Sequence, residues 1–105
     1  MTYGIKYTVE VYHVYEDGRK EKQEKVDNGW QLNEYYTSMK AAKFSLSLVK
    51  EMLKECFYDV HEVNGLTVRG FREWVITGTG YPKIKAQEYV TYHIEPRKFM
   101  PNNNK

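Results

Sequence analysis

Apolar and polar residues alternate along the first part of the chain. Odd positions from 3 to 15 are apolar or aromatic except at His13, and polar residues such as Lys6 and Glu10 lie between them. A period of two is typical of a strand with one buried face. The pattern therefore predicts a long strand from Tyr3 to Tyr15.

A hairpin is predicted next. Asp17-Gly18 tolerates the positive φ of a two-residue turn, and that turn places Tyr15 opposite Lys20. The stretch from Arg19 to Val26 is compatible with an extended backbone but is almost wholly polar. We therefore expect it to form a solvated edge strand, which the break at Asp27-Asn28-Gly29 terminates.

The spacing of the apolar residues changes after this break. Apolar residues recur at spacings of four and three, which draws one stripe along a helix: Tyr35, Met39, Ala42, Leu46, Val49, Leu53 and Cys56. The spacing predicts a helix from Ser38 to Cys56, with Thr37 or Ser38 as its N-cap and Asn33-Glu34 as an alternative, earlier start. Because Cys56 continues the stripe, its thiol is expected to be buried and inert.

Strands are predicted for the rest of the chain. Phe57 to Val63 forms the first of them, Asn64-Gly65 is a strong hairpin signal, and Leu66 to Thr77 returns with Gly70 as an expected bulge. A last strand runs from Ile84 to Ile94. Its even positions are apolar except at Glu88, so they are expected to face inward.

These elements predict an α+β fold of order ββαβββ, an antiparallel sheet with one main amphipathic helix packed on one face. Residues 1–96 are expected to form a single domain, and residues 97–105 a polar C-terminal tail. The helix covers one face of the sheet. The other face is left to solvent or to a partner, and function is expected there.

The composition of the chain indicates the cellular compartment in which it occurs. The chain has 105 residues, a formal net charge of +2 and a single cysteine, which excludes an internal disulfide and a cysteine-rich zinc site. No apolar run approaches the roughly 20 residues that a membrane helix needs. We therefore expect a cytoplasmic protein without a membrane partner.

The chain offers no motif of catalysis or metal binding. His13, His61 and His93 lie in predicted strands without ligand spacing, and Cys56 has no histidine placed beside it by the sequence. We therefore expect a protein that is not an enzyme, with no cofactor, no metal and no catalytic residue.

Two binding surfaces can be proposed from the pattern. The chain contains ten tyrosines, and this residue supplies large, rigid contact area. The first surface binds a protein or a protein–nucleic-acid complex through outward tyrosines and the hairpin tip, with Tyr12, Tyr89, Arg19 and Lys20 as its residues. The alternative is a nucleic-acid-binding module that combines strand aromatics with a helix lysine stripe of Lys40, Lys43, Lys50 and Lys54. A homodimer through a sheet edge is a further predicted partner.

The hairpins at Asp17-Gly18 and Asn64-Gly65 enclose one helix in a short chain rich in tyrosine and lysine. In these whole-chain features it resembles the small proteins of bacteriophages and mobile elements, among them the anti-CRISPR proteins. The resemblance implies a compact inhibitor without a cofactor, which acts by occupying the surface of a partner.

Overall fold

A computed structural model of the chain describes residues 1–23, 27–31, 34–77 and 82–98. Over these residues one helix packs on an antiparallel sheet of six strands, which confirms the predicted α+β fold. The elements in chain order are β1 (Tyr3–Val14), β2 (Lys20–Lys22), β3 (Asp27–Trp30), α1 (Met39–Glu55), β4 (Asp59–Val63), β5 (Thr67–Val75) and β6 (Lys85–Pro96).

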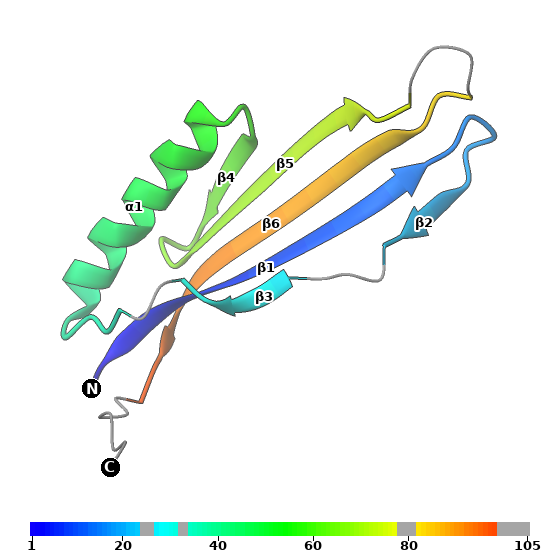
Figure 1. The fold of residues 1–105 in the computed structure, drawn as a ribbon. Coiled ribbons are helices and arrows are strands. Elements are labelled where there is room, and N and C mark those ends of the chain that lie inside the picture. The colour runs from blue at the N-terminus through cyan, green and yellow to red at the C-terminus, as the bar shows by residue number, and fades with distance from the viewer. Residues whose placement is uncertain (24–26, 32–33, 78–81, 99–105) are drawn as a thin grey trace.

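The sheet is built around its first and last strands. Its order is β2-β1-β6-β5-β4, and β3 also pairs with β1 (Figure 1). The pairing of β1 with β6 runs from Tyr3 opposite Pro96 to Val14 opposite Lys85. These long strands continue past the end of α1, so the molecule is elongated and measures 54 Å along its longest axis (Figure 1).

The helix forms where the four-three spacing predicts it. Ser38 is the N-cap, and its hydroxyl accepts a hydrogen bond from the Ala41 N–H at 3.1 Å. The buried stripe of α1 packs on the apolar side of the sheet, and the core consists of Ala42, Leu46, Val49 and Leu53 with Ile5, Val68, Val90 and Ile94. Burial of each larger aliphatic side chain stabilises the fold by about 1.5–3 kcal/mol. The core therefore holds the helix on this face.

The first hairpin differs from its prediction by one residue. The Tyr15 N–H donates to the Arg19 carbonyl at 2.9 Å, and Gly18 has φ +89°, so the loop contains three residues instead of two. Val14 then lies opposite Lys20, and the predicted pairing of Tyr15 with Lys20 is wrong. The extra loop residue shifts the register between β1 and β2 by one position.

The predicted edge strand is not continuous. β2 ends at Lys22, residues 24–26 lie outside the described part of the chain, and β3 covers the sequence where a break was predicted. β3 pairs with β1, with Trp30 opposite Lys6 and Asn28 opposite Thr8. The exposed ladder of the long β1 offers hydrogen bonds that override the low strand propensity of Asn and Gly.

The second hairpin forms at Asn64-Gly65, where both residues have positive φ as a type I′ turn requires. Gly70 is not the predicted bulge, since it pairs in register with Val60 and Val90. A Cβ at Gly70 would lie 2.9 Å from Val90 Cγ2, so glycine is needed here for close packing.

A polar cluster lies at the C-terminal end of α1. Glu88 accepts hydrogen bonds from the Tyr58 hydroxyl at 2.8 Å and from Arg72 Nε at 2.6 Å, and the Arg72 guanidinium lies over the Tyr58 ring. These partners explain how Glu88 occupies an inward position of β6. Burial, and then the hydrogen bond to Glu88, raise the pKa of Tyr58 well above its usual value.

Arg97, the first residue of the predicted C-terminal tail, makes contacts with the domain. The Arg97 N–H donates to the Thr2 carbonyl at 2.9 Å, and its guanidinium lies 4.7 Å from the Trp30 ring centroid. Arg97 is therefore attached to the domain, and residues 99–105 of the predicted tail lie outside the described part.

Candidate functional site on the open sheet face

The second face of the sheet is not covered by a helix among the described residues. Residues opposite one another in an antiparallel pair share a face. Ile5 of β1 and its partner Ile94 belong to the core beneath α1, so even positions of β1 and odd positions of β6 point to the other side. We call this side the open face.

Three aromatic rings meet on the open face. Tyr89 of β6 lies opposite Phe71 of β5, and their ring centroids are 4.9 Å apart. Tyr12 of β1 meets Tyr89 edge to face at 5.7 Å. Together Tyr12, Phe71 and Tyr89 form the aromatic patch, which spans three adjacent strands.

A lysine from the edge strand lies against this patch. Lys20 Nζ is 4.6 Å from the Tyr12 ring centroid and 5.4 Å from that of Tyr89. Arg19 instead lies over Tyr15 at the hairpin, 4.2 Å from the ring centroid. The fold therefore brings together three of the residues proposed from sequence, Tyr12, Tyr89 and Lys20, whereas Arg19 packs on a different ring.

Phe71 was not among the residues proposed from sequence. Its outward position follows from the alternation along β5, but its contact with Tyr89 depends on the register between β5 and β6. Phe71 and Tyr89 also line a hollow of about 230 Å³, together with Arg69 and His61. The aromatic patch therefore continues into a concave surface.

The charges of the open face are largely paired. Lys22 lies 2.8 Å from Glu10, Lys85 lies 3.9 Å from Glu73, and Lys6 lies 4.0 Å from Glu95. Among the described residues, Lys20 and Arg69 have no carboxylate oxygen within 4.0 Å. The positive charge in excess on this face is therefore small and lies beside the aromatic patch.

Basic and aromatic residues that are adjacent in sequence along β1 do not form a common binding surface. Lys6 and Tyr7 are adjacent in sequence but lie on opposite faces of β1, since Lys6 reaches Glu95 while Tyr7 contacts Tyr92 with ring centroids 5.9 Å apart. Alternation along a strand prevents such neighbours from acting on one surface.

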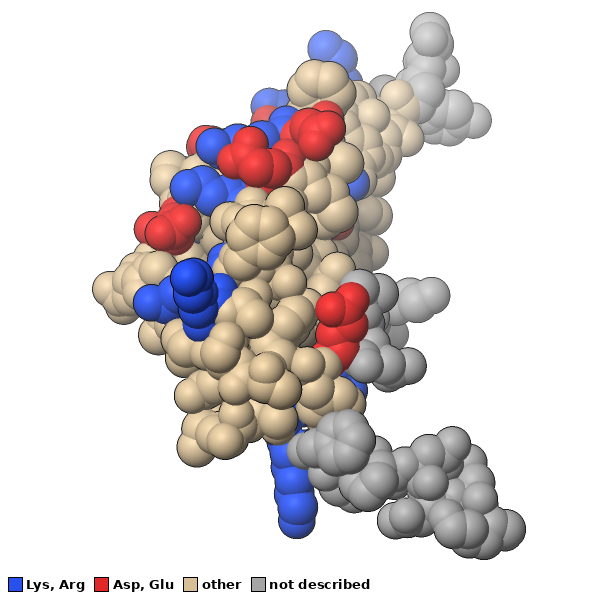
Figure 2. Space-filling model, turned by 90° about the vertical axis from the view of Figure 1, so that its left-hand side faces the viewer, with Lys and Arg blue, Asp and Glu red and all other residues tan. Residues whose placement is uncertain are grey.

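The helix lysine stripe belongs to α1, which packs on the opposite face of the sheet. Lys50 is paired with Glu62 of β4 at 3.3 Å, and Lys54 with Glu51 at 3.5 Å. Lys40 and Lys43 have no such partner among the described residues. Half of the stripe's charge is thus compensated, and Figure 2 shows basic and acidic side chains interleaved over this side.

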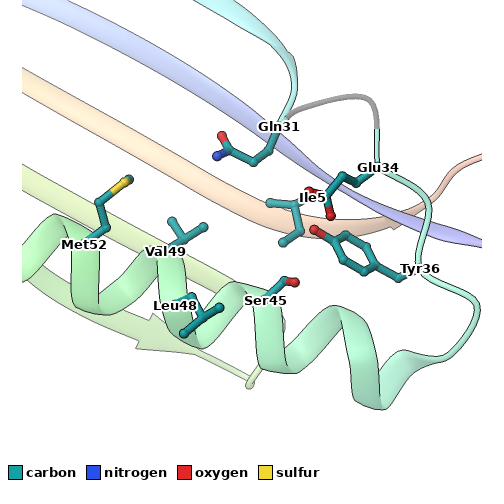
Figure 3. A pocket seen from close by; sticks show the side chains of 8 residues that line it. All are labelled: Ile5, Gln31, Glu34, Tyr36, Ser45, Leu48, Val49 and Met52. Carbon is teal, nitrogen blue, oxygen red and sulfur yellow. The ribbon is translucent and has the colours of Figure 1, made fainter.

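A second hollow lies between α1 and the segment that leads into it (Figure 3). It has a volume of about 220 Å³ and is lined by Ile5, Gln31, Glu34, Tyr36, Ser45, Leu48, Val49 and Met52. The buried stripe of α1 was predicted from the sequence, but this second, outer surface was not.

The groups considered for catalysis remain scattered. Cys56 is exposed, which corrects the prediction of a buried thiol: the helix ends at Glu55, and Cys56 is the C-cap beyond the last buried turn. No histidine is among the described residues that line the hollow beside Cys56. Within the described ranges, no three His, Cys, Asp or Glu side chains gather as a metal site requires, and no helix is both long and apolar enough to cross a membrane.

The chain was compared with protein-family models, with curated proteins and with solved structures, and none of them matches it.

Proposed function

We propose that the chain is a non-enzymatic binding protein that docks on a protein partner through the aromatic patch of its open face. The observation that carries the proposal is the contact of Tyr12, Phe71 and Tyr89 on an uncovered face, with Lys20 over two of the rings. A sheet face that meets only water is normally polar. Large rigid rings grouped there are typical of the centre of a protein interface.

The geometry favours a protein over a nucleic acid as the partner. Bases stack on free ring faces, but Tyr12 and Tyr89 meet at an interplanar angle of 86°, and the Lys20 ammonium lies over both rings. Phosphate binding requires a surplus of cations, whereas most cations of the open face are paired with carboxylates.

Docking of this kind needs no cofactor. In the phage and mobile-element proteins that the sequence resembles, occupation of the partner's surface is itself the activity. Inhibition of the partner is the proposed consequence of docking.

The test begins with capture of partners from a lysate of the source cells, with and without nuclease, and continues with titration of the purified partner. The Tyr12→Ala/Tyr89→Ala variant is compared with a variant in which Lys40, Lys43, Lys50 and Lys54 are all glutamine. Because buried aromatic anchors dominate interface energies, the tyrosine variant should bind at least about tenfold more weakly. The lysine variant should bind within about twofold of the native chain.

Circular dichroism of both variants checks that the fold is retained, since neither set belongs to the buried core. Loss of the captured partner after nuclease treatment would contradict the proposal. Loss of binding by the lysine variant, with a steep fall in affinity between low and moderate salt, would identify the helix stripe as a nucleic-acid site instead.

A further inference from the structure

The outer side of α1 carries a second apolar stripe, which the core does not use. Phe44, Leu48 and Met52 are spaced by four residues, so they lie along one line of the helix. Their exposed fractions are 66%, 55% and 42%. A helix that needs only one apolar face for its own fold therefore presents another to its surroundings.

This stripe borders a hollow whose lining mixes apolar side chains with the polar Gln31, Glu34 and Ser45. Leu48 and Met52 also line the 220 Å³ hollow beside α1, where Figure 3 shows them together with Ile5 and Tyr36. Contiguous exposed apolar surface of this kind marks an interaction site. It lies on the helix side of the sheet, away from the aromatic patch.

Two copies of the stripe match one another when they run in opposite directions. Leu48 is at the centre, with Phe44 one turn before it and Met52 one turn after it. In an antiparallel pair of identical helices related by a two-fold axis at Leu48, each Phe44 lies against the other Met52, and the two Leu48 side chains meet.

The charges at the two ends favour the same arrangement. Lys40 continues the line one turn before Phe44, and Glu55 follows Met52 by three residues. Neither has an ion-pair partner within 4.0 Å among the described residues. An antiparallel pair places each Lys40 beside the other Glu55, whereas a parallel pair would place like charges together.

We propose that the outer stripe of α1 is a homodimer interface in which a second copy packs antiparallel across Leu48. This contact differs from the sheet-edge dimer predicted from sequence, and it leaves both open faces accessible. The dimer would present two aromatic patches, and its existence does not depend on what those patches bind. A contact made by one helix from each copy is at the low end of stable interface sizes, so the association should be weak and reversible.

The test is sedimentation equilibrium of the full chain over roughly three decades of concentration, up to about 1 mM. We expect a mass that rises from the 12.5 kDa of the monomer towards twice that value. Leu48→Glu should remain monomeric while keeping the helical signal in circular dichroism, since this side chain is largely exposed. A native chain that stays monomeric over the whole range would overturn the proposal.

Charge reversal separates this arrangement from unspecific association. Lys40→Glu and Glu55→Lys should each weaken the dimer about tenfold, because two ion pairs become two repulsions. The double variant restores the opposite charges and should return to within about twofold of the native constant. Lys43→Glu is the matched control and should have little effect, because Lys43 is about 140° around the helix from Leu48. A double variant no better than the single ones would refute the antiparallel pairing.

Discussion

The residue after the C-cap of α1, Phe57, is the clearest place at which a single change should stabilise the fold. Phe57 has φ +65°, a left-handed conformation that side chains with a Cβ rarely adopt. Its N–H donates to the Lys54 carbonyl at 3.1 Å, and the Tyr58 N–H donates to the Leu53 carbonyl at 3.0 Å. These are the two bonds of a Schellman motif, whose left-handed position usually contains glycine.

The expected gain from Phe57→Gly follows from three contributions. The left-handed conformation costs a residue with a Cβ about 1–2 kcal/mol, which glycine avoids. Glycine also has greater conformational freedom in the unfolded chain, and this lowers the free energy of unfolding by about 0.5–1 kcal/mol, which offsets part of the gain. The Phe57 side chain is 90% exposed, so its removal sacrifices little buried surface. The free energy of unfolding should therefore rise by about 0.5–1 kcal/mol.

Urea unfolding followed by circular dichroism measures this difference directly, and Phe57→Ala is the matched control. Alanine removes the same ring but keeps the Cβ, so it should not raise the free energy of unfolding. If Phe57→Gly proves no more stable than Phe57→Ala, the backbone strain assigned to Phe57 is wrong.

Two further predictions concern the core and its polar border. Leu46→Ala should lower the free energy of unfolding by about 2–5 kcal/mol, because Leu46 is 3% exposed in the centre of the core. Lys43→Ala should change it by less than about 0.5 kcal/mol, and equal effects in urea unfolding would mean that the stripe is not buried. Above pH 10, the ordinary tyrosine pKa of about 10 lets Tyr58 ionise in the unfolded chain while its raised pKa keeps it protonated in the folded one. Native stability should then fall with rising pH more steeply than that of Tyr58→Phe, and parallel pH profiles for the two chains would count against this role of Tyr58.

The helix and the long strands could be predicted because their patterns are local. The four-three spacing of apolar residues specifies α1, its N-cap Ser38 was one of the predicted alternatives, and alternation identifies β1 and β6. The hairpin register could not be predicted in the same way, because Asp17-Gly18 is compatible with loops of two or three residues. Which loop forms depends on how the polar edge pairs with β1, and this pairing has no apolar face to fix it.

The candidate site could be predicted only in part, because only some of its features depend on local patterns. Alternation places Tyr12 and Tyr89 on the outward face, but their contact with Phe71 depends on strand pairings between distant parts of the sequence. The outer stripe of α1 was visible as the four-residue spacing of Phe44, Leu48 and Met52. It was missed because the stronger inner stripe already accounted for a helix with one buried face.

The length of the sheet relative to the helix separates the core from the proposed binding surface in this fold. The core around Ile5 and Ile94 lies beneath α1, and the aromatic patch lies on the opposite face, near where helix cover ends. Tyr12 and Phe71 are half-buried and Tyr89 is 37% exposed, so substitutions in the patch remove part of this packing but leave the core beneath α1 intact. A dimer formed through the outer stripe of α1 would add to this separation, because its contacts lie on the helix side. Two aromatic patches held by one dimer could then bind a repeated partner more tightly than either patch alone.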